Sequence, residues 1–164
     1  MKRDYPLFIG PALAILLIDQ VSKWLIIRHL ELHQILPIIP GFFNLVLVTN
    51  RGMAFGIFSQ TRSGVPYYFL LAATIGAIVV IVSFFFWTKG NRNWLTIGLS
   101  TILGGAMGNL MDRVRFGYVI DFLDFSLKSY HWPAFNLADS AVTAGTFWLF
   151  INIMKGRSLK GGEH

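Results

Sequence analysis

The residues best suited to chemistry in this sequence are aspartates that lie within or beside long apolar segments. A carboxylate in hydrocarbon costs about 2.5 kcal/mol or more, so such residues are rarely accidental. Two neighbouring carboxyl groups can hydrolyse a peptide bond, because one, ionised, takes a proton from water while the other, protonated, polarises the scissile carbonyl. Burial and mutual repulsion separate their two pKa values and so assign the roles. Residue types alone leave open which pair acts among five candidates: Asp19, Asp112, Asp121, Asp124 and Asp139.

Other hydrolytic chemistries fit the sequence less well. The 164 residues include no cysteine, which excludes a thiol nucleophile, a Cys-ligated zinc site and a disulfide framework. Ser22 and Lys23 are adjacent, so on a helix they point about 100° apart and cannot form a Ser–Lys dyad. His29 and His33 have i, i+4 spacing but lack the H-E-x-x-H arrangement, so we interpret them as a solvated helix end. We expect neither a metal nor a cofactor.

The composition indicates a membrane protein. Hydrophobic residues make up 54% of the chain and charged residues only 13%, about half the share that a soluble domain carries. Four apolar stretches are each close to the ~20 residues that cross the hydrocarbon as a helix. The prediction is a membrane all-α fold with a small β element, in a single domain that spans residues 1–164. The expected transmembrane helices cover about residues 7–27, 66–87, 94–111 and 137–154.

The positions of Lys and Arg predict the orientation of these helices. Residues 1–6, 88–93 and 155–164 hold seven of these cations in 22 residues, whereas the loops at 28–65 and 112–136 hold six in 63. Cytoplasmic segments carry the denser positive charge, so both termini should be cytoplasmic and the two long loops external. The net charge of +6 therefore reflects membrane topology and does not indicate a nucleic-acid partner.

The external loops should contain a small β-sheet. Residues 42–48 are β-branched and aromatic, and Pro40-Gly41 and Asn50-Arg51-Gly52 bound them, which is typical of a short strand. Residues 117–120 are a second candidate strand. We expect this sheet and its loop to rest on the outer membrane surface.

Several of the unusual polar residues also have structural explanations. Asp19 and Lys23 have i, i+4 spacing, so we favour a structural ion pair within the first helix. Asp112 and Arg113 follow the third apolar stretch directly and would mark the end of its helix near the headgroups.

The start of the fourth apolar stretch has structural explanations as well. Asn136 is well placed to cap the first turn of that helix, and Asp139 to interact with its dipole. In the third stretch, Gly104 and Gly108 form a small-xxx-small pattern, which predicts close packing against another helix.

Five short segments, in order along nearly the whole chain, resemble motifs of the lipoprotein signal peptidase (signal peptidase II) family. Each motif is weak evidence alone, but five in the right order in a four-span chain are very specific. They are D-Q-x-[ST]-K at 19–23, N-x-G-A-A-[FW]-G at 50–56 with Met53 for the first Ala, G-x-x-x-G-N-x-x-D-R at 104–113, V-V-D-F at 119–122 with Ile120 for the second Val, and F-N-x-A-D-S at 135–140.

The resemblance implies a role for each matched polar residue. Asp121 and Asp139 would form the catalytic dyad, although Asp124, three residues after Asp121, is an alternative member. The residues that would shape the pocket and contact the substrate backbone are Asn50, Gly52, Asn109, Arg113 and Asn136. The structural supports would be Asp19, Lys23 and Asp112, with Asp112 paired with Arg113.

The resemblance also implies the activity and its location. The family's activity is that of an aspartic endopeptidase, which removes the signal peptide from prolipoproteins by cutting just before a cysteine that carries diacylglycerol. The expected location is the bacterial cytoplasmic (inner) membrane, with several spans and the active site at the outer face. The expected partners are these prolipoproteins and membrane lipids, without nucleic acid, and the chain should be a monomer.

A small proton- or cation-coupled transporter that uses Asp19 and Asp139 is the alternative function, because intramembrane acids often relay protons. Two observations argue against it. Most of the polar residues gather near one face of the membrane, and the second apolar stretch contains no charge that would continue a path across it.

Overall fold

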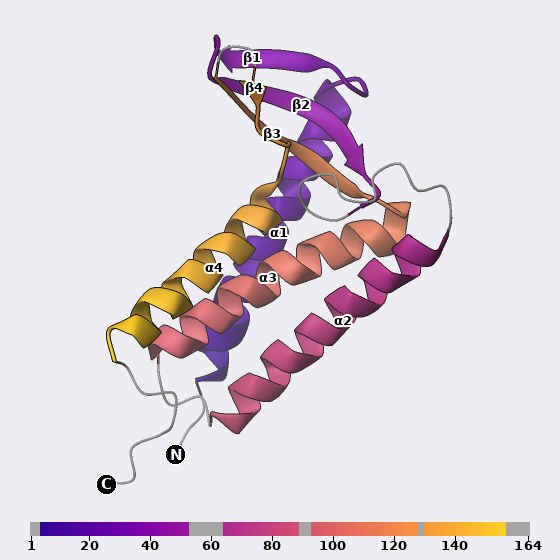
Figure 1. Ribbon diagram of the computed structural model, residues 1–164. Helices are drawn as coiled ribbons and strands as arrows, with labels where there is room; N and C mark the ends of the chain where they lie inside the picture. The colour runs from indigo at the N-terminus through magenta and orange to yellow at the C-terminus, as the bar shows by residue number, and fades with distance from the viewer. Residues whose placement is uncertain (1–3, 53–63, 89–92, 128–129, 157–164) are drawn as a thin grey trace, which may run out of the picture.

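The computed structural model describes residues 4–52, 64–88, 93–127 and 130–156. Four long helices run side by side, and a small sheet lies at one end of them (Figure 1). Both ends of the described chain lie at the other end of the helices. In chain order the elements are α1 Tyr5–His29, β1 Ile35–Ile39, β2 Phe43–Asn50, α2 Gly64–Trp87, α3 Asn93–Phe116, β3 Val119–Leu127, β4 Tyr130–His131 and α4 Leu137–Met154.

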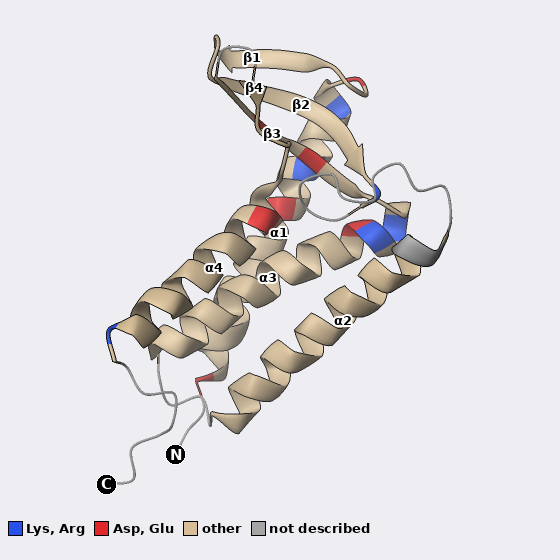
Figure 2. Cartoon of the chain, viewed as in Figure 1, with Lys and Arg blue, Asp and Glu red and all other residues tan. Residues whose placement is uncertain are grey.

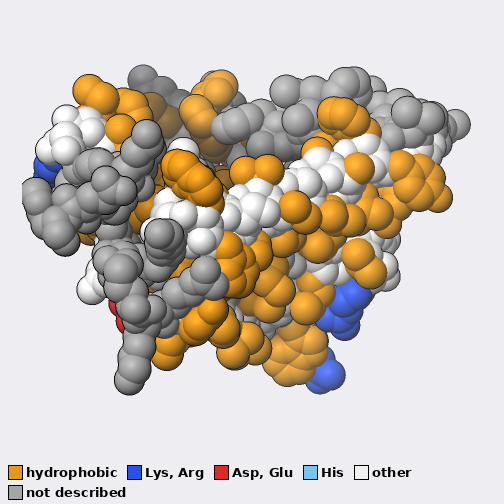
Figure 3. All heavy atoms as spheres, turned by 90° about the horizontal axis from the view of Figure 1, so that it is seen from below, with side chains coloured by type: hydrophobic (Ala, Val, Ile, Leu, Met, Phe, Trp, Pro, Cys, Tyr) orange, Lys and Arg blue, Asp and Glu red, His pale blue; other side chains and the backbone are white. Residues whose placement is uncertain are grey.

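All four helices are long and apolar enough to cross a membrane, by their length and composition. The four predicted spans are therefore confirmed. Hydrophobic side chains cover much of the described surface when the molecule is seen from below (Figure 3). A water-soluble protein rarely exposes so large an apolar surface, whereas helices that face lipid must do so.

The third helix is longer than predicted. Its apolar stretch ends near residue 111, but α3 continues to Phe116, so Asp112 and Arg113 belong to its last turns and not to an external loop. Charged residues limit the apolar run without ending the helix, because Asp112 is buried and ion-paired inside the protein. The helix ends at Gly117, which has a φ of +79° and donates its amide to Arg113 O at 2.9 Å.

Glycines allow α3 to pack closely against two other helices. A Cβ atom at Gly104 would lie 2.7 Å from Ala12 O of α1, and one at Gly105 would collide with Ala138 O of α4. A Cβ at Gly108 would lie 2.5 Å from the Asp19 carboxylate. The predicted role of the small-residue pattern in helix packing is confirmed, and α3 is the central helix on which α1 and α4 both pack.

The sheet is antiparallel, with strand order β1-β2-β3-β4. The strand predicted at 42–48 is present as β2, and the second predicted strand is present as β3, which starts two residues later and runs much further. Apolar side chains of both strands pack on the end of α1, where Ile26 and Leu30 contact Leu47, Ile120 and Phe122. This packing fixes the sheet relative to the helices.

Lys, Arg, Asp and Glu side chains are concentrated at the sheet end of the helices, and α2 contains none of them (Figure 2). At the opposite end the described charges are Asp4 and Lys155. The remaining cations that predict a cytoplasmic location for this end lie outside the described residues: Lys2, Arg3, Lys89, Arg92, Arg157 and Lys160.

Candidate active site

Asp121 is a buried carboxyl group on β3, with 2% of its surface exposed. It lies opposite Val48 of β2, beside an irregularity in the strand register between Leu45 and Val48. Two amides donate to it: Asn136 Nδ2 lies 2.7 Å from Oδ1, and Asn50 Nδ2 lies 2.9 Å from Oδ2. Its carboxyl group is therefore fixed from both sides.

Asp139 is in the first turn of α4 and takes part in a capping box. The side chain of Asn136 accepts from Asp139 N at 2.9 Å, and Asp139 Oδ2 accepts from Asn136 N at 3.4 Å. The other carboxylate oxygen, Oδ1, accepts from Asn109 Nδ2 at 2.8 Å. The predicted N-cap at Asn136 is confirmed, and capping holds the carboxyl group of Asp139 at the end of the helix.

Asn136 joins the two aspartates. Its side chain is fully buried; the amide oxygen binds the backbone of Asp139 while the amide nitrogen binds the carboxylate of Asp121. The same nitrogen lies 3.2 Å from Asn109 Oδ1 and 3.2 Å from Ile120 O. The structure thus brings together the two aspartates that the family motifs indicate, from strand β3 and helix α4.

Both aspartates line one cavity of about 660 Å³. Its polar end is formed by Asn50, Asp121 and Asp139, and the rest of its wall is mostly apolar. One side of the wall is the face of α4, and the other is the segment that leads from β4 to α4. The remaining lining residues are Trp132, Pro133, Ala134, Phe135, Ser140, Val142, Thr143, Ala144 and Phe147.

Burial, followed by the nearby negative charge of Asp139, raises the pKa of Asp121 to about 7. The hydrogen bonds from Asn50 and Asn136 favour the ionised form and so oppose this rise. Near neutral pH the Asp121 carboxyl is therefore poised between its two protonation states. General acid–base catalysis is most effective with a group of this kind.

Lys23 is a buried cation that links α1 to α3 next to the site. Lys23 Nζ lies 2.8 Å from Asp19 Oδ2 and 2.8 Å from Asp112 Oδ2, and donates to Asn109 Oδ1 at 3.2 Å. The predicted ion pair between Asp19 and Lys23 is confirmed. The two carboxylates also accept from the backbone next to Asp139 and Asp121, Asp19 from Ala138 N at 2.9 Å and Asp112 from Ile120 N at 3.1 Å.

The predicted pairing of Asp112 with Arg113 needs correction. The ion-pair partner of Asp112 is Lys23, because neighbouring residues on a helix point in different directions. The guanidinium of Arg113 instead donates to Asn109 O of the same helix at 3.4 Å.

The other expected pocket residues have different positions. Gly52 is buried and donates its amide to Asn50 Oδ1 at 2.9 Å, which orients the Asn50 side chain toward Asp121. Met53 to Gly56, the rest of this motif, lie outside the described residues. Asp124 lies three positions after Asp121 on the same strand, so its side chain points to the opposite face of the sheet. There it binds Asn44 and His131 and does not line the cavity.

Gln20 is a site residue that the prediction missed. Its Nε2 lies within 3.2 Å of Asp19 Oδ2 and Gly108 O, and 2.9 Å from Asp112 Oδ1, so it links α1 to α3 beneath the aspartates. The signal that could have identified it was its place in the D-Q-x-[ST]-K motif. Among the described residues, no group of three His, Cys, Asp or Glu side chains lies close enough together to hold a metal ion.

The fold and the site define a multi-pass membrane protein in which two aspartates, each held by asparagine side chains, line one mostly apolar cavity. Residues 11–155 match the model of a protease family described as signal peptidase (SPase) II. The chain belongs to the signal peptidase II family.

Curated relatives and solved structures agree with this assignment. The lipoprotein signal peptidase of Syntrophotalea carbinolica is 44% identical over 140 residues, which cover 85% of this chain and 86% of that protein. The lipoprotein signal peptidase of Syntrophus aciditrophicus is 39% identical over 160 residues, which cover 98% of this chain and 99% of that protein. A bacterial membrane enzyme solved by the in meso method at 2.3 Å has a TM-score of 0.84 at 31% identity, covering 99% of this chain and 96% of that one. These relatives give no support to the transporter alternative.

Replacing Lys23 with Met should lower the free energy of unfolding by about 3–5 kcal/mol, because two buried carboxylates would lose their shared cation. Thermal unfolding of the purified protein in detergent measures the change. Arg28→Met is the matched control in the same helix: Arg28 is exposed and lies over the Trp24 ring, so the expected loss is about 1 kcal/mol or less. Equal losses in the two variants would show that the buried cation is not needed for stability.

The raised pKa of Asp121 predicts that the protein loses stability as pH rises from about 4 to about 7. Below this window the carboxyl is protonated in both states; within it the unfolded chain releases the proton more readily, which favours unfolding. Asp121→Asn removes this titration. Its Tm relative to the wild type should therefore rise by several degrees between about pH 5 and about pH 8. A constant difference in Tm would contradict the raised pKa.

Proposed function

We propose that the protein is an aspartic endopeptidase that removes signal peptides from prolipoproteins, cutting just before a cysteine that carries diacylglycerol, and that Asp121 and Asp139 are its catalytic pair. The observation that carries the proposal is the single amide of Asn136, which binds Asp121 on one side and Asp139 on the other at the polar end of the cavity. The names of the relatives support the substrate class.

In this mechanism the pair holds one proton near neutral pH. The ionised carboxylate takes a proton from a water molecule, and the water oxygen attacks the carbonyl carbon of the scissile bond. The protonated carboxyl donates a hydrogen bond to the carbonyl oxygen, where negative charge develops. The tetrahedral intermediate then collapses, the C–N bond breaks, and a proton passes to the leaving nitrogen. No metal ion takes part in these steps.

The surrounding polar residues position the pair and the substrate. Asn50 and Asn109 each donate to one of the two aspartates, at 2.9 Å and 2.8 Å, and so hold the carboxyl planes. Gly52 orients Asn50 through its amide. Arg113 supplies positive charge near Asp139, and we propose that it and the asparagines contact the substrate backbone. This constellation needs no cofactor.

A lipid-modified substrate suits the shape of the cavity. Its wall along α4 is formed by side chains that continue from Asp139 toward the membrane interior, such as Val142 and Phe147. The acyl chains can remain in hydrocarbon while the cysteine backbone reaches the aspartates at the end of the helix. Membrane lipids are therefore the second partner that we propose for this surface. We propose no nucleic-acid partner.

We further propose that the enzyme acts as a monomer in the bacterial inner membrane, with both termini cytoplasmic and the aspartates and the sheet at the outer face. The sequence supports this orientation through the dense Lys and Arg side chains of the terminal and 88–93 segments. The sheet end carries most of the described charged residues, which suits a surface that faces water and headgroups.

Asp121→Asn and Asp139→Asn should each lower kcat at least about a thousandfold, because either change removes a group that acts in the transition state. The assay is cleavage of a lipid-modified prolipoprotein by the purified protein in detergent, with Tm as the check on folding. Asp4→Asn, an exposed change at the other end of α1, is the control. Near-normal turnover by either variant would disprove the catalytic pair, and a comparable loss in Asp124→Asn at saturating substrate would favour Asp124 instead.

The natural absence of cysteine makes the orientation directly testable. Leu127→Cys places a thiol on the exposed end of β3, and Lys155→Cys places one just after α4 at the opposite end. A membrane-impermeant maleimide should label Leu127→Cys in intact spheroplasts but Lys155→Cys only after lysis. The wild-type chain should remain unlabelled in both samples. The reverse labelling pattern would invert the proposed orientation.

A further inference from the structure

The segment from residue 130 to residue 136 connects β3 to α4 and forms one wall of the cavity; we call it the strap. Its backbone pairs with β3 at several points: Trp132 N donates to Phe125 O at 2.7 Å, and Phe135 exchanges hydrogen bonds with Leu123 at 2.8 and 3.1 Å. Four of its residues, 132–135, line the cavity. The position of the strap therefore sets the width of the cavity beside the aspartates.

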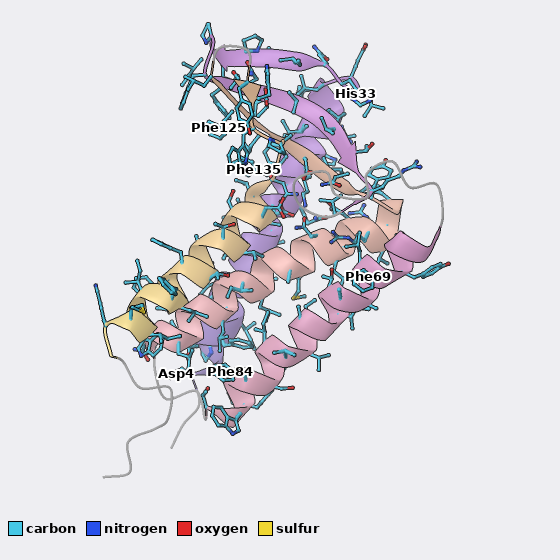
Figure 4. The ribbon with its side chains drawn as sticks, in the orientation of Figure 1. Asp4, His33, Phe69, Phe84, Phe125 and Phe135 are labelled. Carbon is cyan, nitrogen blue, oxygen red and sulfur yellow. The ribbon has the colours of Figure 1, made fainter. Side chains whose placement is uncertain are left out.

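The apolar side of the strap is held by aromatic packing. The rings of Phe125 and Phe135 are stacked, with centroids 5.8 Å apart and an interplanar angle of 13°. Figure 4 shows both rings next to the sheet end of α4. This ring contact and the backbone hydrogen bonds join the strap to the C-terminal half of β3.

The outer part of the strap has a much shorter ladder. Strand β4 contains two residues, Tyr130 and His131, which pair with Leu127 and Ser126 at the end of β3. A two-residue ladder at a sheet edge contributes little stability by itself. A side-chain contact at this point therefore adds to the few interactions that hold the outer part of the strap.

Such a contact is present between His131 and Asp124. His131 Nδ1 lies 2.9 Å from Asp124 Oδ2 and 3.1 Å from Oδ1. Asp124 is 5% exposed, and Asn44 of β2 donates to its Oδ2 at 2.7 Å, so its carboxylate is fixed within the sheet. About half of the His131 side chain is exposed, so it can exchange protons with solvent. The proposed mechanism uses neither residue.

We propose that Asp124 and His131 are positioning residues whose ion pair docks the strap against the sheet, so that substrate binding weakens when His131 loses its proton. The inference rests on the proposed function, because it concerns the cavity in which the signal peptide would be cut. Histidine changes its charge between about pH 5 and pH 8, and a protonated ring binds a carboxylate more strongly than a neutral one.

The side chains that hydrogen-bond next to the pair are neutral. Asn44 donates to Asp124 Oδ2 at 2.7 Å and to Ser126 Oγ at 3.5 Å. Tyr130 precedes His131 on β4, and its ring is exposed. Lys128, between β3 and β4, lies outside the described residues.

The test compares KM and kcat for a lipid-modified prolipoprotein in wild type and His131→Gln across about pH 5.5 to 8.5. Glutamine keeps a neutral donor but carries no titrating charge. The ratio of the variant's KM to the wild-type KM should be about threefold at the acidic end and approach one at the alkaline end, with kcat unchanged. Titration of Asp121 affects both proteins equally and cancels in the ratio.

Three further variants make the comparison specific. His29→Gln is the matched control, since His29 is exposed and bonds only to Leu25 O of its own helix in the described structure; its KM ratio should stay flat with pH. Asp124→Asn should reproduce the effect of His131→Gln. The double variant should be no worse than either single one, because the two residues act through one contact.

Amide hydrogen exchange provides a measurement that does not need cleavage. The amides of residues 130–135 should exchange faster in His131→Gln than in wild type at acidic pH, and at similar rates at alkaline pH. Equal exchange at every pH, or a KM ratio that does not change with pH, would overturn the inference. A wild-type protein that fails to cleave the substrate would instead count against the proposed function, while exchange would still decide whether the pair docks the strap.

Discussion

Both aspartates of the site are held by the side-chain amide of Asn136, and the geometry of the site depends on this buried group. An amide offers a donor and an acceptor at opposite ends, so one side chain can bind a carboxylate on β3 and a backbone N–H on α4 at once. Because this residue is the N-cap of α4, the start of the helix and the arrangement of the two aspartates depend on the same side chain. The aspartates therefore cannot separate without breaking a hydrogen bond of this amide.

The polar layer around this amide is complete. Among the described residues, every buried side-chain nitrogen or oxygen atom has a hydrogen-bond partner. An unsatisfied polar group is more costly inside a membrane protein than in water, because no water molecule is available to form the missing hydrogen bond. Lys23 and Gln20 each donate to several acceptors. Asn109 donates to Asp139 and accepts from Lys23 and Asn136, so these side chains connect α1, α3 and the aspartates into one network. Such a network fixes relative positions that apolar packing alone would leave free to slide.

The sequence predicted the helices well because hydropathy reports directly on the lipid-facing surface. Each of the four apolar stretches has the length and composition of a membrane-spanning helix. The prediction failed at the end of α3, where Asp112 looked like the limit of a helix and is in fact a buried ion-pair partner of Lys23. It also missed β1, whose five residues are all exposed and mostly apolar and so lack the alternation that indicates a strand. Strand β4 is too short to leave any pattern.

The site residues were found by another route. Spacing alone did not select Asp121 and Asp139, because their meeting depends on how strand β3 and the first turn of α4 are brought together. The family motifs did select them, and the structure brings the two carboxyl groups to one cavity. Contacts between distant elements, such as Gln20 with Asp112 or His131 with Asp124, follow from tertiary geometry that no local pattern encodes.

The i, i+4 spacing of Asp19 and Lys23 has a consequence for biosynthesis. During translation α1 emerges before α3 and α4, so Asp112 and the amide of Ala138, which later bind this pair, do not yet exist. A lone charge would make entry of a nascent segment into the bilayer costly. Because the two opposite charges are one turn apart, the first helix can neutralise itself as it leaves the translocon. It then offers a preformed polar docking point to the helices that arrive later.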